Sequence, residues 1–266
     1  MQRPHSFRHL LARAGVAAVS QTAMFTGAYP LVPIAMRCDP ETRSLRVALV
    51  EWATAAALAA ARPLGFAPLP GARVRGPRPI VVVHGYAMNR ACFVPLAYRL
   101  ARAGLGPIVG FEYWSLGRTA AAARQLGWFI DEVRRHTGAA QVDIVGHSMG
   151  GVVARYYVAL GGGDGAVRTL VTIGSPHAGT DMSRVGIGHP TRELVVGSKL
   201  LVRLASAPPP ARTRIVAIWS RGDALVPAAL QHVAGAEEIV LEDLGHVAML
   251  GSPRVAREIV ARLARS

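Results

Sequence analysis

From residue 79 onward, short apolar runs alternate with longer stretches of helical periodicity. The apolar runs are rich in Val and Ile and predict strands at Pro79–Val83, Pro107–Phe111, Val142–Val145, Val167–Ile173, Arg214–Trp219 and Glu237–Leu241. The stretches between and after them predict helices at Phe93–Ala103, Arg118–His136, Gly151–Leu160 and Pro253–Leu263. Continuously apolar strands that alternate with helices are typical of an α/β fold, with a mostly parallel sheet covered on both faces.

The first 70 residues have a different pattern. Ala14–Met36 contains no charged residue or histidine and is long enough to cross a bilayer, although six polar or proline positions dilute it. Val47–Ala61 is also apolar and has Glu51 as its single charge, but it is short for a span and could equally be a helix packed on the protein. Residues 1–70 are therefore expected to be an apolar helical segment that serves as an export signal, a membrane anchor or a cap.

We favour anchoring or attachment at a membrane surface, because no clear small-x-small cleavage site follows the first run. A spanning first run would leave the basic start on the cytoplasmic side. Localisation is thus expected to be membrane-associated or exported, with a cytoplasmic location left open. A linker rich in Pro and Gly over residues 68–79 separates this segment from a catalytic domain expected at 71–266.

Composition narrows the possible partners. The chain of 266 residues is 51% hydrophobic and has a formal net charge of +14, which by itself would suit nucleic acid or an anionic membrane. The Arg residues are scattered, however, and no nucleic-acid-binding motif is present, so we expect no nucleic-acid partner. Cys38 and Cys92 lie far apart without metal or redox spacing and are expected to be unpaired thiols.

The pentapeptide Gly146-His147-Ser148-Met149-Gly150 carries the strongest chemical signal. It stands directly after a predicted strand and directly before a predicted helix. In that context, G-x-S-x-G forms a tight turn that raises the serine hydroxyl at the carboxyl end of the sheet. We therefore expect Ser148 to be a nucleophile. His147 is expected to pack rather than to catalyse.

A serine hydroxyl needs a base that a carboxylate orients, and strand-turn-helix hydrolases supply these in the chain order serine, acid, histidine. Asp223 follows the strand ending at Trp219, and His246 follows the strand ending at Leu241. We assign His246 as base and acid and Asp223 as the orienting carboxylate. The rival acids are Asp243, Glu242 and Asp181. Asp243 stands only three residues before His246, so its carboxylate can hardly turn onto the imidazole.

Acyl transfer also requires hydrogen-bond donors for the developing oxyanion. One is expected to be the backbone amide of Met149, the residue after the nucleophile. The other is expected to be the backbone amide of Tyr86, in the His84-Gly85-Tyr86 loop after the first strand.

These motifs make the chain resemble the α/β-hydrolase superfamily and, within it, bacterial lipases and esterases of the triacylglycerol lipase type. The resemblance covers roughly residues 79–266 and rests on Val81–Gly85, Gly146–Gly151, Ile173–Thr180, Asp223–Pro227 and Gly245-His246. Its most specific piece is Ser175-Pro176-His177-Ala178-Gly179-Thr180. The resemblance implies hydrolysis of carboxylic esters with lipid-like acyl chains.

The chain departs from the family pattern in two places. Many members have two further strands before the His-Gly strand, whereas residues 1–70 look helical, so we expect a sheet of about six strands. Some bacterial lipases bind a structural calcium near the catalytic histidine. Its aspartates cannot be matched here, so we expect neither a metal nor a cofactor.

The segment 180–210 is long for a connection between strands and is expected to be an insertion over the pocket. Thr191–Leu204 suits an amphipathic helix, which is either a lid that opens at a lipid surface or a fixed wall of the acyl pocket. Two other functions remain open beside the ester hydrolase: an acyltransferase or thioesterase on the same scaffold, and a membrane-attached binding protein without catalysis. Oligomeric state is undetermined.

Overall fold

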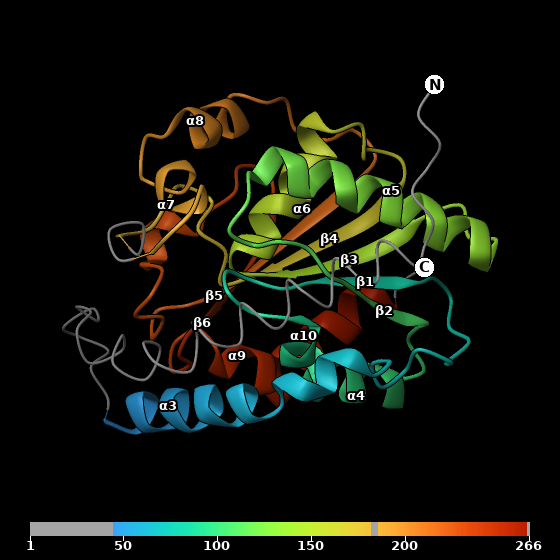
Figure 1. Cartoon of the computed structure of the whole chain (residues 1–266), viewed down its shortest axis with the longest axis horizontal. Coiled ribbons are helices and arrows are strands. Elements are labelled where there is room, and N and C mark those ends of the chain that lie inside the picture. Colours follow the sequence, from blue (N-terminus) through green and yellow to red (C-terminus); the bar gives the residue numbers. More distant parts are fainter. Residues whose placement is uncertain (1–44, 182–185, 265–266) are drawn as a thin grey trace.

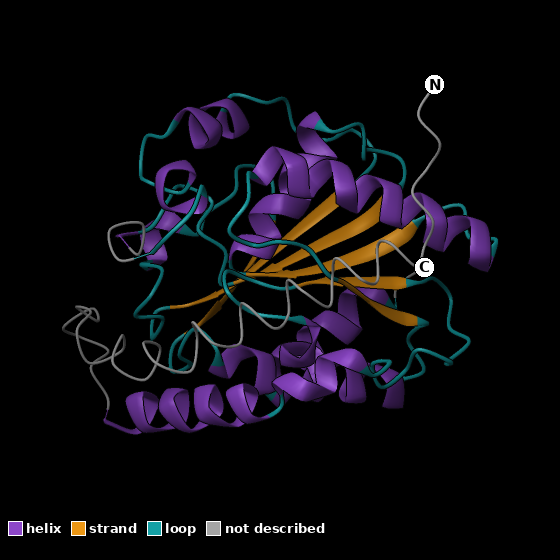
Figure 2. Ribbon diagram, in the orientation of Figure 1, coloured by secondary structure: helices purple, strands orange, loops and turns teal. Residues whose placement is uncertain are grey.

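The structure is a computed structural model that describes residues 45–181 and 186–264. Six strands form one sheet: β1 (Ile80–Val83), β2 (Ile108–Phe111), β3 (Val142–His147), β4 (Val167–Ile173), β5 (Arg214–Ser220) and β6 (Glu237–Leu241). All neighbouring strands pair in parallel, in the order β2-β1-β3-β4-β5-β6 (Figure 2). The expected α/β fold with a six-stranded sheet is confirmed.

Helices cover both faces of this sheet (Figure 1). One layer contains α5 (Thr119–Thr137), α6 (Met149–Leu160), α7 (Pro190–Glu193) and α8 (Lys199–Ala205). The other contains α3 (Leu45–Ala60), α4 (Val94–Arg102), α9 (Ala248–Gly251) and α10 (Pro253–Leu263). Short 3₁₀ turns lie at η3 (Arg62–Phe66), η4 (Arg90–Phe93) and η6 (Ala228–Leu230).

Alternate residues of each central strand enter opposite cores. Val81 and Val83 of β1 pack with α5 and α6, while Ile80 and Val82 pack with α4 and α10. Burial on both faces is why β1 is apolar at every position rather than at every second one.

The strand order places a topological switch between β1 and β3. The chain leaves β1 for β2 on one side and then crosses back to β3 on the other side. Loops that follow strands on either side of such a switch diverge and leave a crevice at the carboxyl edge, where open α/β sheets bind ligands. The two loops concerned carry Tyr86 and Ser148.

The insertion near 180–210 differs from the single amphipathic helix expected at Thr191–Leu204. Two short helices, α7 and α8, replace it. The break has a local cause: Gly197 takes a left-handed φ of 78°, and the Ser198 side chain then accepts a hydrogen bond from the Leu201 amide and begins α8.

The N-terminal part of the described chain packs beneath the sheet. Helix α3, blue in Figure 1, lies beside α9 and buries Glu51, Ala55 and Leu58, while most of its other side chains face outward.

The first apolar run, Ala14–Met36, lies outside the described residues, as does Cys38; Cys92 is a buried free thiol. Among the described helices, none has the length and apolarity to cross a membrane. The domain division at residue 70 stays a prediction.

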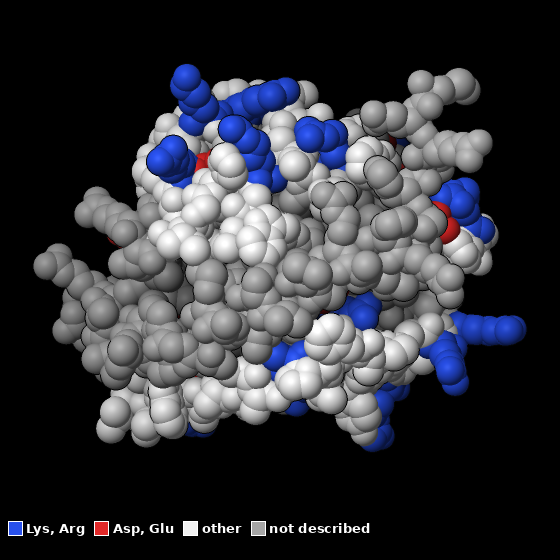
Figure 3. Space-filling view, viewed as in Figure 1, with Lys and Arg blue, Asp and Glu red and all other residues white. Residues whose placement is uncertain are grey.

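Figure 3 shows one face of the molecule by charge. The Lys and Arg side chains visible there fall into separated groups near the top, the right edge and the lower edge. On this face, the described residues form no continuous basic stripe of the kind that follows a nucleic-acid backbone.

The layer of α5 and α6 should depend on complete filling of its core. Leu126 of α5 has no exposed surface and packs in that layer. Leu126→Ala should lower the free energy of unfolding by about 2–5 kcal/mol, because it removes buried methyl groups and leaves a cavity. Urea unfolding followed by circular dichroism measures the change. The neighbouring exposed position supplies the control: Gln125→Ala should stay within about 0.5 kcal/mol of the wild type. Equal effects of the two changes would contradict the packing described.

Candidate active site

Ser148 occupies a one-residue turn between β3, which ends at His147, and α6, which begins at Met149. Its φ of 54° and ψ of −128° lie in a region that residues with a side chain rarely adopt. The Ser148 amide donates a hydrogen bond of 2.8 Å to the Ile173 carbonyl at the end of β4. This strained elbow is the conformation that the G-x-S-x-G pattern predicts.

The elbow packs tightly against the end of β1. A Cβ added to Gly150 would overlap the carbonyl oxygens of Val83 and His84, so only glycine permits this approach. On the other side of the turn, a Cβ on Gly85 would lie 3.0 Å from Cβ of Ser148. The loop after β1 therefore lies directly beside Ser148.

His246 and Asp223 meet at the same edge of the sheet. The Nδ1 atom of His246 donates a 2.7 Å hydrogen bond to Oδ2 of Asp223, and both residues are buried. Asp223 stands just after β5, whereas His246 stands between β6 and α9. A Cβ on Gly174, which follows β4, would lie 3.2 Å from each of the two bonded atoms.

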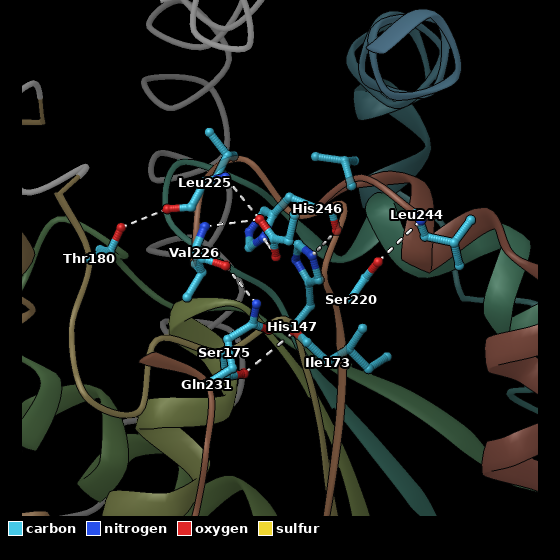
Figure 4. A network of polar contacts seen from close by, with 12 residues as sticks. His147, Ile173, Ser175, Thr180, Ser220, Leu225, Val226, Gln231, Leu244 and His246 are labelled. Atoms are coloured by element: carbon cyan, nitrogen blue, oxygen red, sulfur yellow. Dashed lines mark hydrogen bonds and ion pairs between the residues drawn. The ribbon is translucent and has the colours of Figure 1, made fainter. Parts of the chain in front are cut away.

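The loops that carry this pair are fixed by further hydrogen bonds (Figure 4). The second oxygen of Asp223, Oδ1, accepts 2.9 Å bonds from the amides of Leu225 and Val226. The Ser220 hydroxyl accepts a 3.1 Å bond from the Leu244 amide, which joins the two loops. Because both carboxylate oxygens are engaged, the carboxylate of Asp223 has a fixed orientation toward the imidazole.

Burial and charge act on His246 in opposite directions. Burial by itself lowers the pKa of the imidazole, because the imidazolium form loses hydration. The charge of Asp223, the hydrogen bond that His246 donates to Asp223 and the charge of Glu51 oppose this effect, and the pKa of His246 is raised from its ordinary value. An imidazole in this setting readily accepts a proton.

The rival acids lie elsewhere. Asp243 is exposed and forms a 2.6 Å ion pair with Arg254, and Glu242 pairs with Arg221 at 3.2 Å. Asp181 is exposed. Of the four acids weighed from the sequence, Asp223 is the one that the structure brings to His246.

The two amides expected to bind an oxyanion lie on either side of Ser148. Met149 follows it as the first residue of α6, and Tyr86 follows Gly85. Within the described residues, neither amide donates a recorded hydrogen bond. The Tyr86 hydroxyl both accepts from the Ile187 amide and donates to the Ile187 carbonyl, at 2.7 and 2.8 Å. Tyr86 therefore joins the loop after β1 to the insertion.

The insertion is attached at several further points. Arg155 of α6 donates to the Leu204 carbonyl at 3.1 Å, and the Thr119 amide donates to Glu193 at 2.7 Å. Leu201 and Leu204 are buried in the core beside α6. The insertion thus packs on α6 and on the start of α5, and its opening as a lid stays a prediction.

His147, expected only to pack, has a specific bond. Its Nε2 atom donates to the backbone carbonyl of His246 at 3.0 Å, and the two rings lie 4.8 Å apart. Burial, followed by the nearby His246, holds the pKa of His147 well below its usual range, so this ring is neutral. The motif that identifies Ser148 contains this residue, but its partner stands 99 positions away and no sequence pattern reveals the contact.

His177, in the Ser-Pro-His segment, is buried and bonds the Thr172 hydroxyl at 3.1 Å. Burial lowers its pKa to about 3, with a further contribution from Arg155, so His177 is also neutral.

In residues 45–181 and 186–264, no group of three or more His, Cys, Asp or Glu side chains is arranged to hold a metal.

The chain is similar to known proteins in sequence and in fold. Residues 78–192 match the family model of the alpha/beta hydrolase fold. A stretch of 59 residues, 22% of the chain, is 37% identical to triacylglycerol lipases of Pseudarthrobacter phenanthrenivorans and Burkholderia plantarii. That stretch spans only 18% and 16% of these curated relatives.

Among solved structures, a lipase of Bacillus licheniformis in its mature form superposes with a TM-score of 0.62 at 14% identity. The superposition covers 70% of this chain and 91% of the lipase, and at that identity it establishes the fold alone. Together with the six-stranded parallel sheet and the strained elbow, these matches identify the chain as a protein of the α/β-hydrolase fold that resembles bacterial lipases and esterases.

Proposed function

We propose that this protein is a serine hydrolase that cleaves carboxylic esters with lipid-like acyl chains, through an acyl-enzyme on Ser148. The observation that carries the proposal is the buried Asp223–His246 hydrogen bond at the carboxyl edge where Ser148 occupies its strained turn. A buried imidazole paired with a carboxylate, at the same edge of the sheet as a partly exposed serine, is the arrangement that activates a hydroxyl nucleophile.

The chemistry follows from which ring nitrogen is free. Nδ1 of His246 is bonded to Asp223, so Nε2 takes the proton from Ser148 Oγ as that oxygen attacks the ester carbonyl. The amides of Tyr86 and Met149 stabilise the tetrahedral oxyanion. His246 then returns the proton to the leaving alcohol, which departs. Water, deprotonated in the same way, attacks the acyl-enzyme and releases the acid and free Ser148.

Two observations support lipid-like substrates at a membrane or micelle surface. The curated relatives that match part of the chain are triacylglycerol lipases. In addition, large apolar side chains on α3 and η3 are exposed: Leu45, Leu49, Val50, Trp52, Leu64 and Phe66. Exposed apolar side chains of this kind suit contact with a lipid surface. We infer that the protein is membrane-associated or exported and acts on esters at such a surface.

Removal of the nucleophile should abolish turnover. Ser148→Ala should lower kcat on p-nitrophenyl esters by about 10⁶-fold, because the acyl-enzyme can no longer form. A fluorophosphonate probe should label the wild type and leave Ser148→Ala unlabelled. Turnover by Ser148→Ala at the wild-type rate would refute the assignment. Failure of the probe to label the wild type would favour a binding protein without catalysis.

The acid assignment predicts unequal effects of two matched substitutions. Asp223→Asn should lower kcat by about 10⁴-fold, because the amide no longer stabilises the imidazolium or selects the tautomer of His246. Asp243→Asn, which changes an exposed carboxylate paired with Arg254, should change kcat less than about twofold. The measurement is steady-state hydrolysis of one soluble ester. The opposite order of effects would transfer the role to Asp243.

Substrate class is tested with p-nitrophenyl esters of increasing acyl length, with and without detergent micelles. A lipid-ester hydrolase should give its highest kcat/KM on long chains, with a rise above the critical micelle concentration. Highest activity on short chains without such a rise would identify an esterase of soluble substrates. Ser148→Ala, assayed in parallel, corrects for hydrolysis that the active site does not cause.

A further inference from the structure

Glu51 is a buried acid on a helix whose other charged residue, Arg46, is exposed. It stands on α3 at 5% exposure, one turn before Ala55, on the narrow face that the helix turns toward the protein. A buried carboxylate loses hydration and is stable only where hydrogen bonds or charges replace the lost water. Its surroundings therefore show what this residue does.

The partners of Glu51 are the residues around His246. The Val247 amide donates to both carboxylate oxygens, at 2.8 and 3.0 Å, and the Ala248 amide donates to Oε2 at 2.8 Å. A Cβ on Gly245 would clash with the Glu51 carboxylate, so this position on the other side of His246 also requires glycine. Glu51 thus contacts the backbone on both sides of His246, across 196 positions of sequence.

Three groups together define the position of His246. Asp223 bonds its ring, His147 bonds its carbonyl oxygen, and Glu51 bonds the next two amides. Asp223 and His147 belong to loops or strands of the sheet, whereas Glu51 comes from outside the sheet, on a helix of the N-terminal segment. Hydrogen bonds to a charged acceptor are shorter and stronger than those to a neutral one, so an ionised Glu51 resists displacement of this turn.

The same carboxylate acts on the charge of the imidazole. The titratable groups around His246 are Asp223, Glu51 and His147, and His147 is neutral. The pKa of Glu51 is raised from its ordinary value, chiefly by burial and also by the charge of Asp223; the Val247 and Ala248 amides and the charge of His246 offset this rise only in part. In its ionised form, Glu51 adds to the effect of Asp223 in raising the pKa of His246.

We propose that Glu51 is a positioning residue of the active site, which fixes the turn that carries His246 and places a second negative charge beside its imidazolium form. This rests on the function proposed above. It makes helix α3 a required part of the catalytic unit, whatever other role the N-terminal segment has.

The test compares kcat, KM and the pH dependence of kcat/KM for the wild type, Glu51→Gln and Glu51→Asp on one soluble p-nitrophenyl ester. Glu51→Gln keeps the shape but places an NH₂ group among backbone donors and removes the charge. It should lower kcat on the order of 10-fold with little change in KM, because a misplaced base slows the chemical step. Activity requires neutral His246, so the acidic limb should move to lower pH when the charge of Glu51 is lost.

Two further variants separate this role from a general structural one. Glu51→Asp retains the charge on a shorter side chain, so it should keep the acidic limb of the wild type while kcat falls. Glu242→Gln makes the same chemical change at an exposed ion pair and should leave both kcat and the pH profile unchanged. Folded Glu51→Gln with the kcat and pH profile of the wild type would overturn the proposal.

If Glu51→Gln does not fold, Glu51→Asp decides the question: a kcat at least threefold lower at unchanged KM supports the proposal, and a full kcat overturns it. An inactive wild type would instead mean that the proposed ester hydrolysis fails. The rate of fluorophosphonate labelling at Ser148, which needs the same base but no ester substrate, then provides the comparison between Glu51 variants. Equal labelling rates would overturn the role of Glu51 independently.

Discussion

Asp223 and His246 share a hydrogen bond of 2.7 Å in a position from which water is excluded, and the rest of the site is arranged around that constraint. Two ionisable groups are stable in such a place only if their remaining bonding capacity is satisfied. The Leu225 and Val226 amides donate hydrogen bonds to the second carboxylate oxygen of Asp223. The Ser220 hydroxyl accepts a hydrogen bond from Leu244 and so joins the loop of Asp223 to the loop of His246. Polar atoms from several separate segments are thus needed to hold one carboxylate and one imidazole in position.

The sheet makes this convergence possible. Because all six strands run parallel, the loops after β1, β3, β4, β5 and β6 leave the same edge of the sheet. The connections after β1 and β3 diverge at the topological switch, and the strained turn at Ser148 is the one that follows β3. The strain at Ser148 is supported by close packing of Gly150 on β1 and by the bond from the Ser148 amide to Ile173.

The contacts of the candidate site reach well beyond the loop that carries His246. The elbow residue His147 reaches its carbonyl from the core, and Glu51 reaches the following amides from α3 beneath the sheet. On the opposite side of the crevice, Tyr86 binds the insertion through Ile187. Displacement of α3 would therefore move the turn that carries His246, and displacement of the insertion would move the loop after β1.

The sequence by itself determined where the strands lie along the chain, because strands buried on both faces of a sheet are mostly apolar. Predicted strand limits such as Val167–Ile173 and Glu237–Leu241 agree with the structure, and Val142–Val145 falls two residues short of the observed end at His147. The elbow at Ser148 was predictable because its turn is local: glycine, serine and glycine stand within five residues. The choice of Asp223 over Asp243 followed from its place after the strand ending at Trp219 and from the short reach of Asp243, and the structure does bring Asp223 to His246.

Only the tertiary structure decided the contacts that join distant segments. Glu51 read as a single charge in an apolar run, and His147 read as a packing residue, because their partners lie 196 and 99 positions away. Periodicity carries no information on such pairs, since they depend on how α3 and the end of β3 approach the loop after β6. The insertion was misjudged for a related reason: its apolar positions fit one helix, but the left-handed Gly197 and the capping Ser198 divide it where the chain folds back onto α6.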